Sequence, residues 1–231
     1  MSKKIILLAG PTASGKSKLA IQLAKRLNGE IINADSMQIY KEFTILSSRP
    51  DNKETRKVKH HLYGIISVKK HFSAGDWLKL AKNKINLCYK FKKVPIIVGG
   101  TGLYFNTITK GISKIPAIDI QTRSKVRNLF KKLGYKEFYK KLLNLDPNVK
   151  NKILPSDSQR SQRAYEVILK TKKSLFDWIA DTESDFINFE ISKIYIDIPR
   201  DELLKKIYLR TELMFKNKCI KEVKKFNLLK L

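Results

Sequence analysis

A glycine-rich loop between an apolar run and an amphipathic segment limits most strongly what this chain can fold into. Residues 5–9 are apolar, and apolar residues recur at helical spacing from Lys16 to Leu27. A strand, a glycine loop and a helix in this order form a phosphate-binding loop, in which backbone amides and the helix N-terminus face phosphate oxygens. We expect Lys16 to neutralise a di- or triphosphate and the Ser17 hydroxyl to hold Mg²⁺. The predicted loop residues are Gly10, Pro11, Thr12, Ala13, Ser14, Gly15, Lys16 and Ser17.

More apolar runs follow the loop and alternate with helical patterns. Strands are predicted at residues 30–34, 94–98 and 193–198, with a weaker candidate at 62–68. Helices are predicted at 72–91, where Ser73 is the expected N-cap, at 103–109 and from Asp201 onward. The alternation predicts an α/β fold, a P-loop NTPase-like parallel sheet flanked by helices.

The residue pattern changes from alternating strands and helices to helices alone between the third and the last predicted strand. Residues 115–180 show helical periodicity, with 15 lysines and arginines against 6 acidic residues and aromatic residues interleaved among them. Rings among positive charges suit stacking on RNA bases. We therefore expect an inserted all-helical subdomain at 115–190, and a catalytic core made of residues 1–114 and 191–231.

The formal net charge of +27 has two explanations. Basic side chains that neutralise phosphates release counterions and drive nucleic-acid binding. Alternatively, a chain rich in Ile, Asn and Lys reflects an A+T-biased genome, since only 9 of its 48 basic residues are arginine. Against that background, arginines are expected where bidentate geometry matters.

Polar residues follow the predicted strands at the edge that carries the phosphate loop. Asp35 comes after the second strand and Thr101 after the third, so both should meet the loop at one site. Asp35 has three candidate roles: a metal-holding acid, a general base, or the N-cap of a helix beginning at Ser36. In the insertion, helical spacing puts Arg160 and Arg163 on one face, which suits phosphates or bases but also an ordinary solvated helix start.

Other residue types argue against other classes of protein. His60 and His61 are adjacent and His71 lies apart, so no histidine metal site is expected. Cys88 and Cys219 are expected to be free thiols. No apolar stretch approaches the roughly 20 residues of a membrane helix, so we expect a cytoplasmic protein.

Taken in order along the whole chain, these motifs resemble those of the tRNA dimethylallyltransferases, also called tRNA isopentenyltransferases. Besides the phosphate loop, the matching segments are Asp35-Ser36 with Ile39-Tyr40, His60-His61-Leu62, Phe72 to Asp76, Val98 to Tyr104, Asp157 with Gln159-Arg160 and Arg163-Ala164, and Arg200 to Met214. Their combination is highly specific, although each segment apart from the loop is a weak signal.

The resemblance implies transfer of a dimethylallyl group from dimethylallyl diphosphate to the N6 amine of adenine 37 of tRNA, beside the anticodon. It implies that Asp35 accepts the amine proton, while Lys16, Arg210 and Mg²⁺ on Ser17 stabilise the departing diphosphate. A monomer that binds the anticodon stem-loop is expected. The implied tRNA contacts are Asp35, Ser36, Met37, Gln38, Thr101, Arg123, Gln159, Arg160, Ser161, Gln162 and Arg163.

The sequence departs from the family pattern at two places. The family usually has an acidic residue where this chain has Gly64, and it continues past the equivalent of Leu231. We therefore expect marginal stability and a frayed end after about residue 215.

Two other functions remain possible from the sequence. A P-loop nucleoside or small-metabolite kinase that binds ATP would share the loop, and a basic RNA-binding module could carry a vestigial one. The length, charge and aromatic residues of the insertion favour the transferase over the kinase.

Overall fold

The computed structural model describes residues 3–229 and divides into two compact units, treated separately below. The sheet unit comprises Met1–Thr109 and Asp185–Leu231, and the helical unit comprises Lys110–Ser184. The helical unit ends before the predicted residue 190, because Phe186 is buried in the core of the sheet unit.

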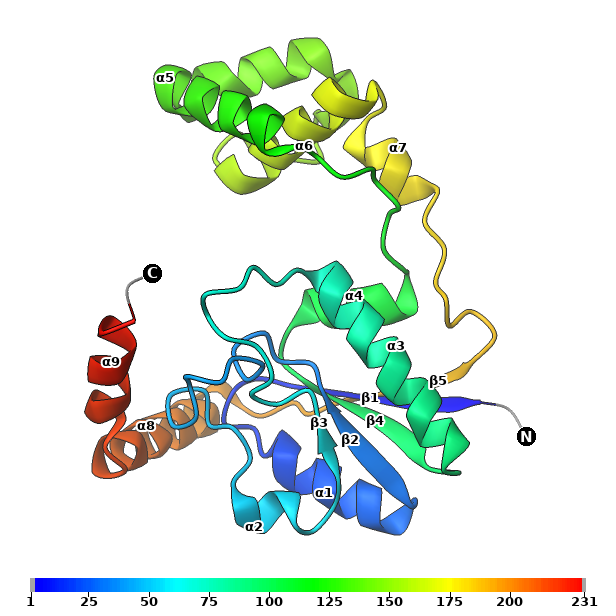
Figure 1. Ribbon diagram of the computed structural model, residues 1–231, viewed down its shortest axis with the longest axis vertical. Helices are drawn as coiled ribbons and strands as arrows, with labels where there is room; N and C mark the ends of the chain where they lie inside the picture. Colours follow the sequence, from blue (N-terminus) through cyan, green and yellow to red (C-terminus); the bar gives the residue numbers. More distant parts are fainter. Residues whose placement is uncertain (1–2, 230–231) are drawn as a thin grey trace. The chain divides into compact units, whose positions relative to one another are not determined.

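The sheet unit is built on a parallel sheet of five strands, in the order β3-β2-β4-β1-β5 (Figure 1). The helices α3 and α4 cover one face of the sheet and α1 covers the other, which confirms the predicted α/β fold (Figure 1). The strands are β1 (Lys4–Ala9), β2 (Gly29–Asn33), β3 (His60–His61), β4 (Val94–Gly99) and β5 (Glu190–Tyr195). The helices are α1 (Lys16–Arg26), α2 (Asn52–Thr55), α3 (Ala74–Lys90), α4 (Gly102–Thr109), α8 (Arg200–Lys216) and α9 (Cys219–Asn227).

Apolar side chains fill both faces of this sheet. Side chains alternate along a strand, so Ile5 and Leu7 of β1 join the core beneath α3 and α4, while Ile6 and Leu8 pack with α1. A run that is apolar at every position is therefore buried on both sides, as parallel sheets require.

Two predicted strands lie elsewhere in the structure. The weak candidate at 62–68 is wrong: β3 is only His60–His61, and the His61 Nε2 atom lies 2.6 Å from Glu30 Oε2 of β2. The last strand runs over Glu190–Tyr195 rather than 193–198. It lies at the edge of the sheet with half-exposed or exposed side chains, so its sequence has no continuous apolar run.

The helix α3 begins as predicted and anchors the carboxyl end of β2. Its N-cap, Ser73, forms a capping box with Asp76, in which each side chain accepts a hydrogen bond from the backbone amide of the other residue. Trp77 Nε1 donates to the Asn33 carbonyl oxygen at 2.8 Å, and the Trp77 ring stacks on Tyr104 of α4 at 4.3 Å. These contacts hold β2, α3 and α4 together beside the strand ends.

The helical unit, all of whose residues are described, contains no strand, as predicted. Its elements are α5 (Ile120–Leu145), the short 3₁₀ helix η1 (Pro147–Val149), α6 (Ser158–Thr171) and α7 (Leu175–Ala180). Gly134 interrupts α5 with a φ of 70°, a value that glycine adopts without strain. Phe138 and Leu142 of α5 pack with Ala164 and Tyr165 of α6 to form a separate core.

The last two helices are largely exposed. The helix α8 buries none of its residues, and Leu204 and Leu213 are 51% and 57% exposed. The segment expected to fray after residue 215 instead contains α9, which buries Cys219. Lys230 and Leu231 lie outside the described residues. Between residues 3 and 229, no helix is both long and apolar enough to cross a membrane.

Candidate active site

The ends of β1, β2 and β4 and one side of α8 surround a cavity of about 640 Å³ in the sheet unit. The structure therefore brings together the phosphate loop, Asp35 and Thr101, as predicted from the strand ends. Arg210 of α8, which the family resemblance implied, lines the same cavity. The lining residues are Gly10 to Ser17, Asp35, Gln38, Ser47, Ser48, Tyr63, Val98 to Thr101, Lys206, Leu209, Arg210 and Leu213.

The phosphate loop is shaped to receive an anion. Gly15 precedes α1 with a φ of 87° and provides no side-chain cap, so the first amides of α1 remain available to a ligand. Ser14 Oγ is buried and has no hydrogen-bond partner among the described residues. Lys16 Nζ donates to the carbonyl oxygens of Gly10 and Pro11, at 2.8 and 2.6 Å. A phosphate group would supply an acceptor to Ser14 and to Lys16 alike.

Three cations, Lys16, Lys206 and Arg210, and one carboxylate, Asp35, line this cavity. Arg210 donates to Thr12 Oγ1 at 2.7 Å, which ties α8 to the phosphate loop. Burial lowers the pKa of Lys16, and it lowers the pKa of Arg210 as well, while the negative charge of Asp35 opposes both shifts. Bringing phosphate charge into the cavity would favour the charged forms of both cations.

Asp35 is held by a set of short contacts at the end of β2. Its Oδ1 accepts hydrogen bonds from the amides of Met37 and Gln38, at 2.9 and 3.4 Å, so it caps a turn rather than the predicted helix. Asn33, which is fully buried, accepts from the Asp35 amide at 2.8 Å and donates to its carbonyl oxygen at 3.0 Å. Within the described residues, no hydrogen bond reaches Asp35 Oδ2, which leaves that oxygen for another partner.

Thr101 joins the strand that bears Asp35 to the strand beside it. Its Oγ1 accepts from the Ser36 amide at 2.9 Å, and its own amide donates to the Ala34 carbonyl oxygen at 3.1 Å. Gly99 permits this approach, because a Cβ atom there would lie 2.0 Å from the Ala34 oxygen. Thr101 therefore has a structural role at the predicted position.

The oxygen ligands that Mg²⁺ prefers are present in the cavity. The Ser17 hydroxyl and the Asp35 carboxylate both belong to its lining, beside the loop that would hold phosphate. Protein sites for Mg²⁺ combine few protein oxygens with phosphate oxygens and water. These residues therefore fit a magnesium ion shared with a bound diphosphate.

A second group of possible ligands lies in the core and was not anticipated from the sequence. Glu30, His61 and Cys88 are buried with their ligand atoms within 4.8 Å of one another. Ligands of a tetrahedral zinc ion stand about 3.3 Å apart. His61 Nε2 and Glu30 Oε2 are only 2.6 Å apart, and the Cys88 thiol donates to the same Glu30 oxygen at 3.9 Å. The group is therefore a hydrogen-bonded cluster that joins β2, β3 and α3.

The predicted RNA contacts of the helical unit lie at the start of α6, with one exception at the start of α5. Arg160 is exposed and pairs with Asp157, the N-cap of α6, at 3.2 Å, and Arg163 approaches Glu166 at 3.5 Å. Gln159 is also exposed, whereas Gln162 is half-buried and donates to the Ser158 carbonyl oxygen. Ser161 Oγ and Arg123 Nε are buried without a hydrogen-bond partner in the described chain.

Ser161, one of the predicted RNA contacts, is only 1% exposed and does not lie on the surface of the helical unit. Sequence reasoning also missed Ser47, Ser48 and Tyr63, which line the cavity. Ser47 and Ser48 belong to a loop without a strand or helix pattern, so periodicity had no signal to offer there.

A family model described as IPP transferase matches residues 38–230. A tRNA dimethylallyltransferase of Pelagibacter ubique is 53% identical over 228 residues, which are 99% of this chain and 73% of that protein. One from Rickettsia massiliae is 42% identical over 96% of this chain and 61% of its own length.

Solved structures give the same family. A eukaryotic dimethylallyltransferase described as acting on tRNA superposes with a TM-score of 0.84 at 28% identity, over 98% of this chain and 56% of that one. The tRNA isopentenylpyrophosphate transferase of Bacillus halodurans gives 0.64 at 30% identity, over 97% and 70%. This chain thus spans 56% to 73% of the length of these four proteins. With its loop, its strand-end aspartate and this similarity along nearly all its residues, the chain belongs to the IPP transferase family of tRNA dimethylallyltransferases.

Proposed function

We propose that this chain transfers the dimethylallyl group of dimethylallyl diphosphate to the N6 amine of adenine 37 of tRNA, adjacent to the anticodon, and releases diphosphate. The observation that carries the proposal is one cavity in which a phosphate-binding loop and Arg210 face Asp35. An anionic leaving group and a proton acceptor are the two requirements of alkyl transfer from a diphosphate to an amine.

The donor diphosphate is assigned to the loop side of the cavity. The loop amides, Lys16 and Arg210 stabilise the negative charge that grows as the bond between the allylic carbon and the diphosphate oxygen breaks. Leu209 and Leu213 of α8 belong to the same lining and offer apolar contact to a five-carbon chain. The leaving group and the hydrocarbon would thus each meet side chains of matching polarity.

The acceptor adenine is assigned to the side of Asp35. Its exocyclic amine is a poor nucleophile, because the nitrogen lone pair is delocalised into the purine ring. As the nitrogen attacks the allylic carbon, Asp35 accepts the amine proton, and Oδ2 is the oxygen that the surrounding turn leaves free. The adenine must leave the base stack of the anticodon loop to reach a cavity of this kind.

Magnesium is part of the proposal, with the Ser17 hydroxyl as its protein ligand. When bound, the ion supplies positive charge beside the diphosphate oxygens. The protein groups then need to offset only part of the charge of the leaving group.

The anticodon stem-loop is assigned to residues of both units. Asp35, Gln38 and Thr101 line the cavity, and Ser36 and Met37 lie between the first two in the chain. Arg123 and the segment from Gln159 to Arg163 belong to the basic helical unit. We also propose a monomer acting in the cytoplasm, where tRNA is found and where the two buried thiols, Cys88 and Cys219, stay reduced.

The test is incubation of the chain with radiolabelled dimethylallyl diphosphate, Mg²⁺ and unmodified tRNA, beside an ATPase assay and a kinase assay. Label on the tRNA, lost when adenine 37 is replaced, is the expected result. ATP consumption without labelled tRNA would favour the P-loop kinase instead.

A further inference from the structure

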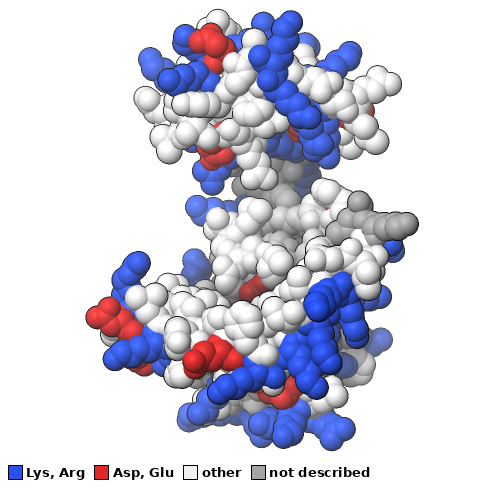
Figure 2. Space-filling model, turned by 90° about the vertical axis from the view of Figure 1, so that its left-hand side faces the viewer, with Lys and Arg blue, Asp and Glu red and all other residues white. Residues whose placement is uncertain are grey.

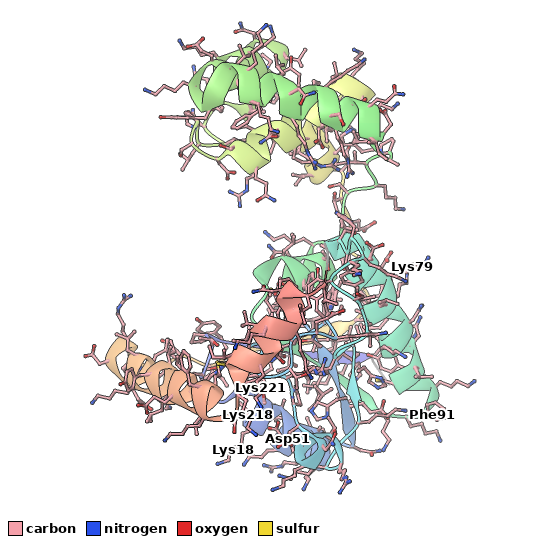
Figure 3. The ribbon with its side chains drawn as sticks, turned by 60° about the vertical axis from the view of Figure 1, so that its left-hand side comes forward. Lys18, Asp51, Lys79, Phe91, Lys218 and Lys221 are labelled. Carbon is pink, nitrogen blue, oxygen red and sulfur yellow. The ribbon has the colours of Figure 1, made fainter. Side chains whose placement is uncertain are left out.

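One carboxylate on α9 binds three consecutive backbone amides of a distant loop. Glu222 Oε1 accepts from the amides of Thr44 and Ile45, at 2.6 and 3.0 Å, and its Oε2 accepts from Leu46 at 2.9 Å. Figure 3 shows α9, with Lys218 and Lys221 labelled at its start, in front of the loop that leads to Asp51. Hydrogen bonds to an ionised acceptor are about twice as strong as neutral ones, so Glu222 holds this loop firmly.

The loop, residues 43–49, is a compact turn with a second contact to α9. The rings of Phe43 and Phe226 lie 4.8 Å apart, one on each element. Ser47 Oγ donates to the Phe43 carbonyl oxygen at 2.7 Å, and Arg49 donates to Thr44 Oγ1 at 2.9 Å. Hydrogen bonds within the loop therefore hold it together, and Glu222 and Phe226 of α9 hold it in place.

The other end of the same loop lines the candidate active site. Gln38 Nε2 donates to the carbonyl oxygens of Ser47 and Ser48, both at 2.9 Å. Both serines and Gln38 belong to the cavity lining, and the Gln38 amide donates to Asp35 Oδ1. A continuous path of contacts runs from Glu222 through the loop and Gln38 to the turn that holds Asp35.

We propose that Glu222 is a positioning residue for the acceptor side of the active site. By holding residues 43–49, it keeps Gln38 and the Asp35 turn in the arrangement that receives the adenine. This role rests on the proposed function. The phosphate loop and its contact with Arg210 are not part of the path, so donor binding should not depend on Glu222.

The test compares Glu222→Ala and Glu222→Gln with the matched control Glu212→Ala, which removes an exposed glutamate of α8. In Glu222→Ala, amide exchange at residues 44–46 should accelerate, and the single-turnover rate at saturating donor and tRNA should fall about 10-fold or more, since small displacements of reacting groups are costly. Donor affinity should stay within about two-fold of wild type, as expected for a change outside the diphosphate contacts. Glu222→Gln keeps one acceptor oxygen and should fall between Glu222→Ala and wild type.

Two results would overturn the role of Glu222: a wild-type rate in Glu222→Ala despite faster exchange at 44–46, or an equal loss of rate in Glu212→Ala. If Glu222→Ala does not fold, Glu222→Gln decides, and an unchanged rate with faster exchange rejects the role. Failure of the wild-type chain to label tRNA would reject the proposed function itself, which separates the two ideas.

Discussion

At the scale of single residues, Asp35 shows how one side chain can serve both structure and chemistry. The sequence predicted its place at a strand end but left three roles open. The structure shows that Oδ1 caps a turn, while Asn33 fixes the backbone on either side. The Asn33 contribution could not be predicted, because its third partner is the carbonyl oxygen of Leu62, which is distant in sequence. This leaves Asp35 Oδ2 as the oxygen that can accept a proton.

The variant Asp35→Asn should separate these two roles. An asparagine still offers an oxygen to the amides of Met37 and Gln38 but has no carboxylate to accept a proton. We expect the melting temperature and donor affinity to stay close to wild type, while turnover falls by about 10² or more. Single-turnover labelling of tRNA measures this, and a near-wild-type rate would leave Asp35 as a cap alone.

At the scale of elements, the sequence predicted those parts whose pattern is local. The phosphate loop and the capping box of Ser73 each span only a few consecutive residues, so both can be recognised from the order of residues alone. The loop at 43–49 could not be predicted in this way, because its amides are bound by Glu222, far along the chain. The predicted bounds of the edge strand β5 were a few residues too late for a related reason, since pairing with β1 decides where this strand begins and ends.

The close approach of the β2 and β4 ends predicts opposite outcomes for two adjacent glycines. In Gly99→Ala, the new Cβ atom would lie 2.0 Å from the Ala34 carbonyl oxygen, so the strand ends must separate. Such overpacking costs about 1–3 kcal/mol of folding free energy. In the control Gly100→Ala, the nearest atom is 3.9 Å away, and little change is expected. Urea unfolding of both variants measures the difference, and equal stabilities would contradict this account.

At the scale of the whole molecule, the positive charge is too widespread to identify a binding surface by itself. On the face shown in Figure 2, lysine and arginine side chains outnumber acidic ones over both units. The sequence therefore could not distinguish codon bias from RNA binding. In the structure, Arg160 pairs with Asp157, the N-cap of α6, and Arg163 lies beside Glu166 of the same helix. These contacts hold both arginines near the start of α6. The positions of these arginines, rather than the total positive charge, are what can distinguish RNA binding from codon bias.

Two double variants of equal charge change can test placement against amount. Arg160→Ala with Arg163→Ala removes two charges at the start of α6, and Lys131→Ala with Lys132→Ala removes two exposed charges from α5. Each lost phosphate contact should reduce the slope of log Kd against log salt by about one. We expect weaker tRNA binding and a slope lower by up to about two for the arginine pair only, with donor affinity unchanged in both. If binding followed the amount of charge, the lysine pair would show the same loss in a salt titration of tRNA binding, and the arginines would have no special role.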